Sequence, residues 1–194
     1  PKSQLVARAA AACARNWDSE VIRAATAAST IGADAGSLTT EAFDTTNYQI
    51  EANYGAGSTS VGITVDKLNE AYRIFEHAEN DMEQPFTLII GSKQHADLRN
   101  QAQVTSSDFT NNGGILVDGK VKRFMGFDIV VSERLTTFTS NSSTCRRCLA
   151  FPKDGMYVGY WLDTKTEVFR RPDLSSNPWD INTMFSISTT RTEQ

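Results

Sequence analysis

The sequence contains little of what nucleophilic, redox or metal chemistry requires. Its 194 residues include three cysteines and two histidines, His77 and His95. Cys145 and Cys148 are three positions apart in the sequence, whereas Cys13 is distant from both. An odd number of cysteines at this spacing excludes a disulfide framework and indicates production in a reducing compartment. A structural zinc site needs four ligands, and these residues offer no second pair at ligand spacing. We therefore expect no metal site, no cofactor and no catalytic residue.

The Cys145-Arg-Arg-Cys148 pair still leaves two interpretations open. Neighbouring arginines can lower the pKa of a thiol and make its thiolate redox-active. A single Cys-x-x-Cys pair is weak support for such chemistry, and two thiols that enter a strand from a polar loop explain it equally well. We expect the second, structural interpretation to hold.

The chain also lacks long hydrophobic runs and an excess of positive charge. The Ala-rich start is interrupted by Arg8, Arg15 and Asp18, and no window holds the roughly 18 apolar residues of a membrane span. No secretory signal is present, so we expect a soluble protein. The net charge is −4 and the isoelectric point about 5.2. This balance disfavours nucleic-acid binding driven by a strongly basic surface, although a local basic patch stays possible.

Motifs of known enzymes are missing as well. The Gly-rich stretch at 55–62 has neither the Gly-Lys-Ser/Thr ending of a phosphate-binding loop nor the glycine spacing of a dinucleotide site, so we interpret it as a flexible connection. His77 falls at the polar end of a predicted helix and His95 in the first turn of another, and we expect both on the solvated surface. The acidic residues at 79–83 suit a solvated turn. The sequence predicts no enzyme.

The first half of the chain is predicted to be mainly helical. An Ala-rich helix is expected over residues 5–28, followed by a partly ordered connection over 32–62. Thr64 is a candidate N-cap for a helix that ends near Glu79. The run FTLII at 86–90 has the length and composition of a buried strand, and a short helix capped by Ser92 is expected after it.

The second half is predicted to consist of strands. After a polar segment at 105–114, strand patterns occur at 115–117, 121–132, 148–151, 156–162, 166–171 and 181–190. Helices come early and strands late, without strict alternation. The fold class is therefore α+β rather than a doubly wound α/β domain.

One late segment combines aromatic and basic residues, namely Phe169, Arg170, Arg171 and Trp179. Such residues can stack on bases and pair with phosphates in nucleic-acid-binding proteins. In a chain with net charge −4, we favour a salt bridge between subunits or a contact at the rim of a subunit interface instead.

Three stretches together resemble the major capsid proteins of tailed bacteriophages, which have the Hong Kong 97-type fold. They are FTLIIGSKQHADLRN, TSSDFTNNGGILVDGKVKRFMGFDIVVSERL and EVFRRPDLSSNPWDINTMFSISTTR. The first two are similar to the axial lobe of that fold and the third to its closing strands with their Arg-Pro turn. The Ala-rich helix is similar to the spine helix of the family. Thr189-Thr190-Arg191 departs slightly from the commoner Gly-Ala-Thr-Arg ending.

The resemblance implies an α+β fold with a long spine helix and two lobes. Residues 1–60 and 152–194 would form the peripheral lobe, and residues 61–151 the axial lobe. Family members carry an N-terminal arm and an extended hairpin loop before the spine helix, and we expect this sequence to lack both, as a fragment or the retained part of a longer protein. We therefore assign no crosslinking residue. Residues 1–194 alone are expected to assemble poorly, because the contacts left to them would be those of the loops near 105–114 and 136–147.

In function, the resemblance implies the structural subunit of an icosahedral capsid that self-assembles into pentamers and hexamers around double-stranded DNA. It implies non-specific contact with packaged DNA on the inner face, and scaffolding, portal and decoration proteins as further partners, without a membrane. The location would be the virion, after synthesis in the host bacterial cytoplasm. Two alternatives stay open: a bacterial nanocompartment shell protein of the same fold, or an enzyme or small-molecule-binding domain with an unrecognised site.

Overall fold

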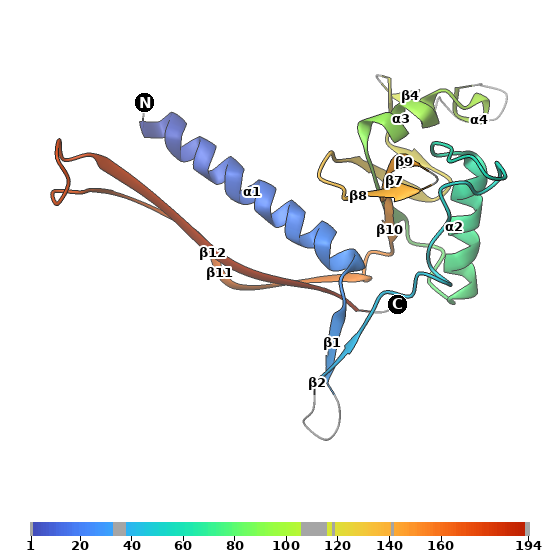
Figure 1. Ribbon diagram of the computed structural model, residues 1–194, viewed down its shortest axis with the longest axis horizontal. Helices are drawn as coiled ribbons and strands as arrows, with labels where there is room; N and C mark the ends of the chain where they lie inside the picture. Colours follow the sequence, from blue (N-terminus) through green and yellow to red (C-terminus); the bar gives the residue numbers. More distant parts are fainter. Residues whose placement is uncertain (1, 33–37, 106–115, 118, 141, 193–194) are drawn as a thin grey trace.

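A computed structural model describes residues 2–32, 38–105, 116–117, 119–140 and 142–192. One long helix and a long two-stranded ribbon extend from a compact unit, and a small hairpin projects near the point where they meet (Figure 1). None of the helices described is both long and apolar enough to cross a membrane. The mixture of helices with mainly antiparallel sheets is the α+β class that the order of sequence patterns predicts.

The long helix α1 (Lys2–Thr26) confirms the helix expected over 5–28, displaced by about one turn. Its Ala-rich sequence favours the helix and presents a narrow surface to a neighbour. The C-terminal part of α1 lies along the ribbon: the Trp17 ring is 5.1 Å from that of Tyr160, and the Thr189 hydroxyl donates to the Glu20 carbonyl at 3.0 Å.

The ribbon consists of β11 (Met156–Arg170) and β12 (Trp179–Arg191), paired antiparallel. The sequence predicts two separate strands in place of β11. The structure joins them through two register shifts, between Tyr160 and Leu162 and between Leu162 and Lys165. Such bulges let a strand continue past residues that do not fit the ladder.

A hairpin of β1 (Ser29–Gly32) and β2 (Leu38–Glu41) follows α1 directly, where the sequence predicts an irregular connection. β-branched Thr and Ile make these short segments compatible with strands. At its base, Arg191 donates hydrogen bonds to the carbonyls of Ala27 and, at 3.1 Å, Glu41, and its guanidinium lies 5.5 Å from the centre of the Phe43 ring. A single buried side chain therefore joins α1, the hairpin and β12.

The compact unit is built on a four-stranded sheet of order β10-β3-β7-β6. The strands are β3 (Phe86–Ile90), β6 (Arg123–Phe124), β7 (Phe127–Val131) and β10 (Leu149–Phe151), and β3 and β7 are parallel. Phe86, Leu88 and Ile90 alternate with less buried residues, as expected for one face of a strand. The prediction of a buried strand at 86–90 is confirmed.

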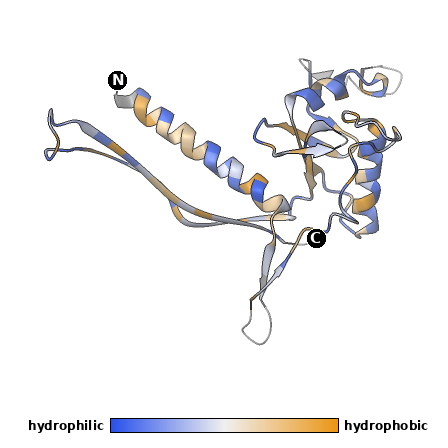
Figure 2. Ribbon diagram, viewed as in Figure 1, coloured by the Kyte–Doolittle hydropathy of each residue, from blue (hydrophilic) through white to orange (hydrophobic). Residues whose placement is uncertain are grey.

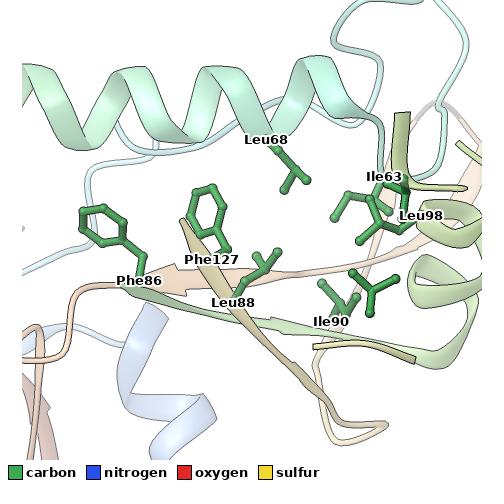
Figure 3. Close-up of a cluster of buried hydrophobic side chains, with 9 residues drawn as sticks. Ile63, Leu68, Phe86, Leu88, Ile90, Leu98 and Phe127 are labelled. Atoms are coloured by element: carbon green, nitrogen blue, oxygen red, sulfur yellow. The ribbon is translucent and has the colours of Figure 1, made fainter. Parts of the chain in front are cut away.

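Helix α2 (Val65–His77) lies over this sheet, with Leu68 and the core side chains between them (Figure 3). Phe75 stacks on Phe86, with ring centres 4.3 Å apart. The predicted N-cap is confirmed, because the Thr64 hydroxyl accepts from the Lys67 amide at 3.4 Å. The helix ends before Glu79, which has a positive φ of 55°.

Helix α3 (Ser92–Arg99) follows β3, but the prediction that Ser92 caps it is wrong. The N-cap position is Gly91, which has no side chain to offer, and Ser92 is the first helical residue. The carboxylate of Glu133 takes the capping role by accepting from the Ser92 amide at 2.6 Å. The short helix α4 (Ala102–Thr105) comes next, and most of the predicted polar segment at 105–114 lies outside the described residues.

The strand expected over 121–132 is divided in the structure into β5 (Lys120–Val121), β6 and β7. Met125 and Gly126 form the turn between β6 and β7 with φ values of 51° and 79°, as in tight two-residue hairpin loops. Before β5, β4 (Leu116–Val117) pairs with it. The loop expected at 136–147 is instead a hairpin of β8 (Thr137–Ser140) and β9 (Ser143–Arg146).

Candidate assembly surfaces

The structure places the three cysteines in different parts of the fold and in different surroundings. All three are free, Cys145 lies in β9, and Cys148 packs against the core of the compact unit. Burial raises the pKa of Cys148 to about 11, so this group is a thiol rather than a thiolate at neutral pH. The described residues hold no group of three or more His, Cys, Asp and Glu side chains placed to share a metal ion. The absence of a metal role stays a prediction.

The two histidines differ in their surroundings. His77 is exposed, as the sequence predicts, whereas His95 is buried, so the prediction of a solvated His95 is wrong. The Nε2 atom of His95 accepts a hydrogen bond from the Val121 amide at 3.2 Å. Desolvation lowers the pKa of His95, and the charges of Arg99 and Lys120 lower it further. This neutral imidazole connects α3 to β5 and has a structural role.

The Gly-rich stretch is fastened to α2 rather than free. The ammonium group of Lys67 donates to the carbonyls of Ala52, Val61 and Gly62 at 2.8, 2.9 and 3.0 Å. Burial lowers the pKa of Lys67. The cation is already held by backbone oxygens, so this lysine stabilises the connection instead of offering a phosphate site.

A separate open hollow of about 390 Å³ lies beside the start of α2, lined by Tyr54, Gly55, Asp66, Asn69, Glu70 and Arg73. Three of its side chains are hydrogen-bonded to one another: the Tyr54 hydroxyl donates to Glu70 at 3.1 Å, and Glu70 also accepts from Arg73. The acidic turn after α2 is exposed, as the sequence predicts, and Asp81 accepts from the Glu83 amide at 3.0 Å.

The ribbon carries several large apolar side chains that are exposed. Hydrophobic positions occur along it among hydrophilic ones (Figure 2). Phe185 and Thr189 of β12 face α1, and side chains alternate between the two faces of a strand. The opposite face therefore holds Met184 and the residues of β11 that pair with even-numbered positions of β12. We call this the uncovered ribbon face, and its apolar members are Tyr157, Leu162, Phe169 and Met184.

Trp161 is the most exposed large apolar residue of the ribbon. Its side chain is 92% exposed, and it lies at the register shift between Tyr160 and Leu162. A bulge re-aims the side chain it carries. Polar residues such as Lys165 and Glu167 stand between the apolar members of the uncovered ribbon face. With Trp161, these members give the ribbon several exposed apolar side chains of the kind found at contacts with other proteins.

At the ribbon tip, the aromatic and basic residues are engaged within the chain. The Arg170 guanidinium lies 4.6 Å from the centre of the Trp179 ring. Arg171 pairs with Asp173 at 2.6 Å and with Asp180 at 3.5 Å. These salt bridges lie within one chain, so the salt bridge or rim contact between subunits expected here stays a prediction. Sequence inspection missed the uncovered ribbon face, because the register that sorts side chains between the two faces depends on the bulges.

Comparison with known proteins gives a consistent result. Residues 1–194 match the family model described as phage capsid protein. A chain from the capsid structure of the cyanophage P-SCSP1u is similar with a TM-score of 0.63 and 14% identity, covering 98% of this chain and 62% of that one. No curated protein matches the sequence.

A second similar structure comes from Mycobacterium phage Che8, with a TM-score of 0.53 and 16% identity, covering 68% of this chain and 47% of that one. The chain thus spans less than two thirds of either structural neighbour, and identities this low show a shared fold alone. The family match extends over all residues of the sequence, and it shows that the chain belongs to the phage capsid protein family.

Proposed function

We propose that this chain is the structural subunit of an icosahedral bacteriophage shell, which assembles with copies of itself into pentamers and hexamers around double-stranded DNA. The family assignment supports a phage capsid rather than the nanocompartment alternative, and a structural rather than an enzymatic role. The proposed location is the virion, after synthesis in the host bacterial cytoplasm. Scaffolding, portal and decoration proteins belong to the same proposal as further partners.

The observation that carries the proposal is the apolar surface of the ribbon. Trp161 is 92% and Tyr157 63% exposed, on an element that reaches away from the compact unit (Figure 1). Exposed aromatic residues are typical anchors of protein interfaces, where one such anchor is worth about 2 kcal/mol or more. In a closed shell of identical subunits, the partner that covers this surface is a second copy of the chain.

The division into lobes is part of this proposal. The helix α1 packs on the ribbon, and we assign residues 1–60 and 152–194 to the peripheral lobe of a Hong Kong 97-type subunit. The core cluster between α2 and the sheet comes from residues 61–151, which we assign to the axial lobe. The boundary that we propose between residues 151 and 152 lies in the connection between β10 and β11.

Substitution of Trp161 tests the proposal. We expect Trp161→Ser to fold normally and to weaken association by about 2 kcal/mol per contact, roughly thirty-fold, because the anchor is lost. Tyr54→Ser, which removes a 38% exposed aromatic ring from the compact unit, is the matched control. Sedimentation velocity measures the assembled fraction. Equal assembly of both variants would contradict the role of the ribbon.

A further inference from the structure

The N-terminal part of α1 carries positive charge alone. Residues 2–17 include Lys2, Arg8 and Arg15, and the first acidic residue of the sequence is Asp18. The whole chain has a net charge of −4, so this part of the helix differs from the average surface. Figure 1 shows it extending away from the compact unit.

The arginines lie on the side of α1 that faces away from the ribbon. A residue advances about 100° around an α-helix, so Arg8 and Arg15 lie within about 20° of one another. Trp17, which packs against Tyr160 of the ribbon, lies about 180° from Arg8. Arg8 and Arg15 are both exposed, and the residues between them on this side are alanines.

The compact unit adds a third arginine to the same side. The Arg134 guanidinium donates to the Ser19 hydroxyl at 3.4 Å, and that hydroxyl donates to the Arg15 carbonyl at 2.9 Å. Arg134 therefore lies one helical turn beyond Arg15. From Arg8 to Ser19 the helix rises about 16 Å, which corresponds to roughly five base-pair steps of a DNA duplex.

Acidic groups close to this side have partners of their own. Glu20 pairs with Arg23 at 2.6 Å, and Glu133, next to Arg134, pairs with Arg146 at 2.6 Å. Asp18 is the exception: it is exposed, lies about 60° around the helix from Arg15, and offsets part of the positive charge on this side. We propose that Arg8, Arg15 and Arg134 form a basic face that binds the phosphates of packaged duplex DNA. This inference rests on the proposed function, because it requires the side of α1 opposite the ribbon to face the interior of the shell.

The proposal predicts a specific dependence of DNA binding on salt. Each phosphate contact contributes about −0.9 to the slope of log K against log salt concentration. Arg8→Gln/Arg15→Gln/Arg134→Gln should therefore make the slope shallower by about 2 to 3, through the loss of three contacts. Fluorescence anisotropy of the purified protein with a labelled duplex, over about 50 to 200 mM salt, measures it.

The matched control removes the same charge elsewhere, as Lys122→Gln/Arg123→Gln/Lys153→Gln, and should keep the wild-type slope. If the triple variant of the basic face loses its fold, the double variant Arg8→Gln/Arg15→Gln, which changes exposed helix positions, is measured instead. It should still make the slope shallower by about 1 to 2. Circular dichroism checks folding.

Three outcomes would overturn the inference: no binding of the duplex by the wild type, equal slopes for both triple variants, or binding of an acidic peptide in place of DNA. The last outcome would indicate a protein partner. Electron microscopy of the same samples separates this inference from the proposed function. Shells that form while the slopes are equal contradict the basic face alone, whereas failure of the full-length wild-type protein to form shells contradicts the proposed function.

Discussion

The carboxylate of Glu133 accepts a hydrogen bond from the backbone amide of Ser92 at 2.6 Å and so caps a helix that begins 41 residues earlier. The same carboxylate pairs with Arg146 of the β8–β9 hairpin at 2.6 Å. One exposed side chain therefore fixes the start of α3 and the end of β9 relative to each other.

Replacement of Glu133 should lower stability in a pH-dependent way. The hydrogen bonds from Ser92 hold the pKa of Glu133 below its ordinary value of 4.5. A lowered folded-state pKa means that the stabilisation is complete above about pH 4.5 and is lost as the pH falls through the lower value. We expect Glu133→Ala to lower Tm at neutral pH and to match the wild type once Glu133 is protonated. A Tm deficit that stays constant down to the most acidic pH would contradict this role.

Removal of the Arg191 side chain should destabilise the junction of α1, the hairpin and β12. Hydrogen bonds from a charged donor contribute about 1.5 to 3 kcal/mol, and Arg191 is buried. We expect Arg191→Ala to cost about 2 to 3 kcal/mol of unfolding free energy in urea titrations. Arg170→Ala, on the exposed part of the ribbon, should change it by less than about 0.5 kcal/mol. Equal losses in the two variants would contradict the account.

Acid should destabilise the protein through His95. Because desolvation lowers its pKa below 6.5, the neutral imidazole stabilises the fold fully above pH 6.5, and this contribution disappears as the pH falls through the folded-state pKa. His95→Gln keeps an acceptor for the Val121 amide without a titrating group. We expect the drop in Tm between about pH 7 and pH 5 to be smaller in this variant. The same drop in both proteins would show that His95 does not cause it.

Truncation of a core phenylalanine should lower stability, whereas truncation of a ribbon phenylalanine should lower assembly. Phe127 is fully buried, and its truncation to Ala should cost about 3 to 5 kcal/mol. Phe169 lies on the uncovered ribbon face and is 41% exposed, so Phe169→Ala should melt close to the wild type yet assemble less. Calorimetry and light scattering on the same samples compare the two effects. A destabilised Phe169→Ala variant would place this residue in a core.

Elements that local patterns define could be predicted from the sequence. The spacing of Leu68 and Phe75 in α2 and the run at Phe86–Ile90 led directly to the observed helix and strand. The hairpins β1–β2 and β8–β9 were missed, because their Thr- and Ser-rich strands have the composition of loops. All four positions of β2 are exposed, so alternation does not mark that strand, although β8 does alternate.

Features that depend on distant residues could not be predicted. His95 is buried by contact with Val121, which is 26 residues away, and nothing near His95 in the sequence indicates it. The capping role of Glu133 and the junction at Arg191 depend on the fold in the same way. The uncovered ribbon face required the strand register, so the sequence indicated the loops near 105–114 and 136–147 as contacts between subunits and did not indicate this face.

Electron microscopy of the full-length protein would show whether the ribbon is an interface between subunits. The account predicts closed icosahedral particles in which the ribbon of each subunit, with Trp161, lies against a second copy, and predicts that Trp161→Ser subunits stay folded but largely unassembled. Particles in which Trp161 is exposed to solvent, or a wild-type protein that remains monomeric at all concentrations, would contradict it.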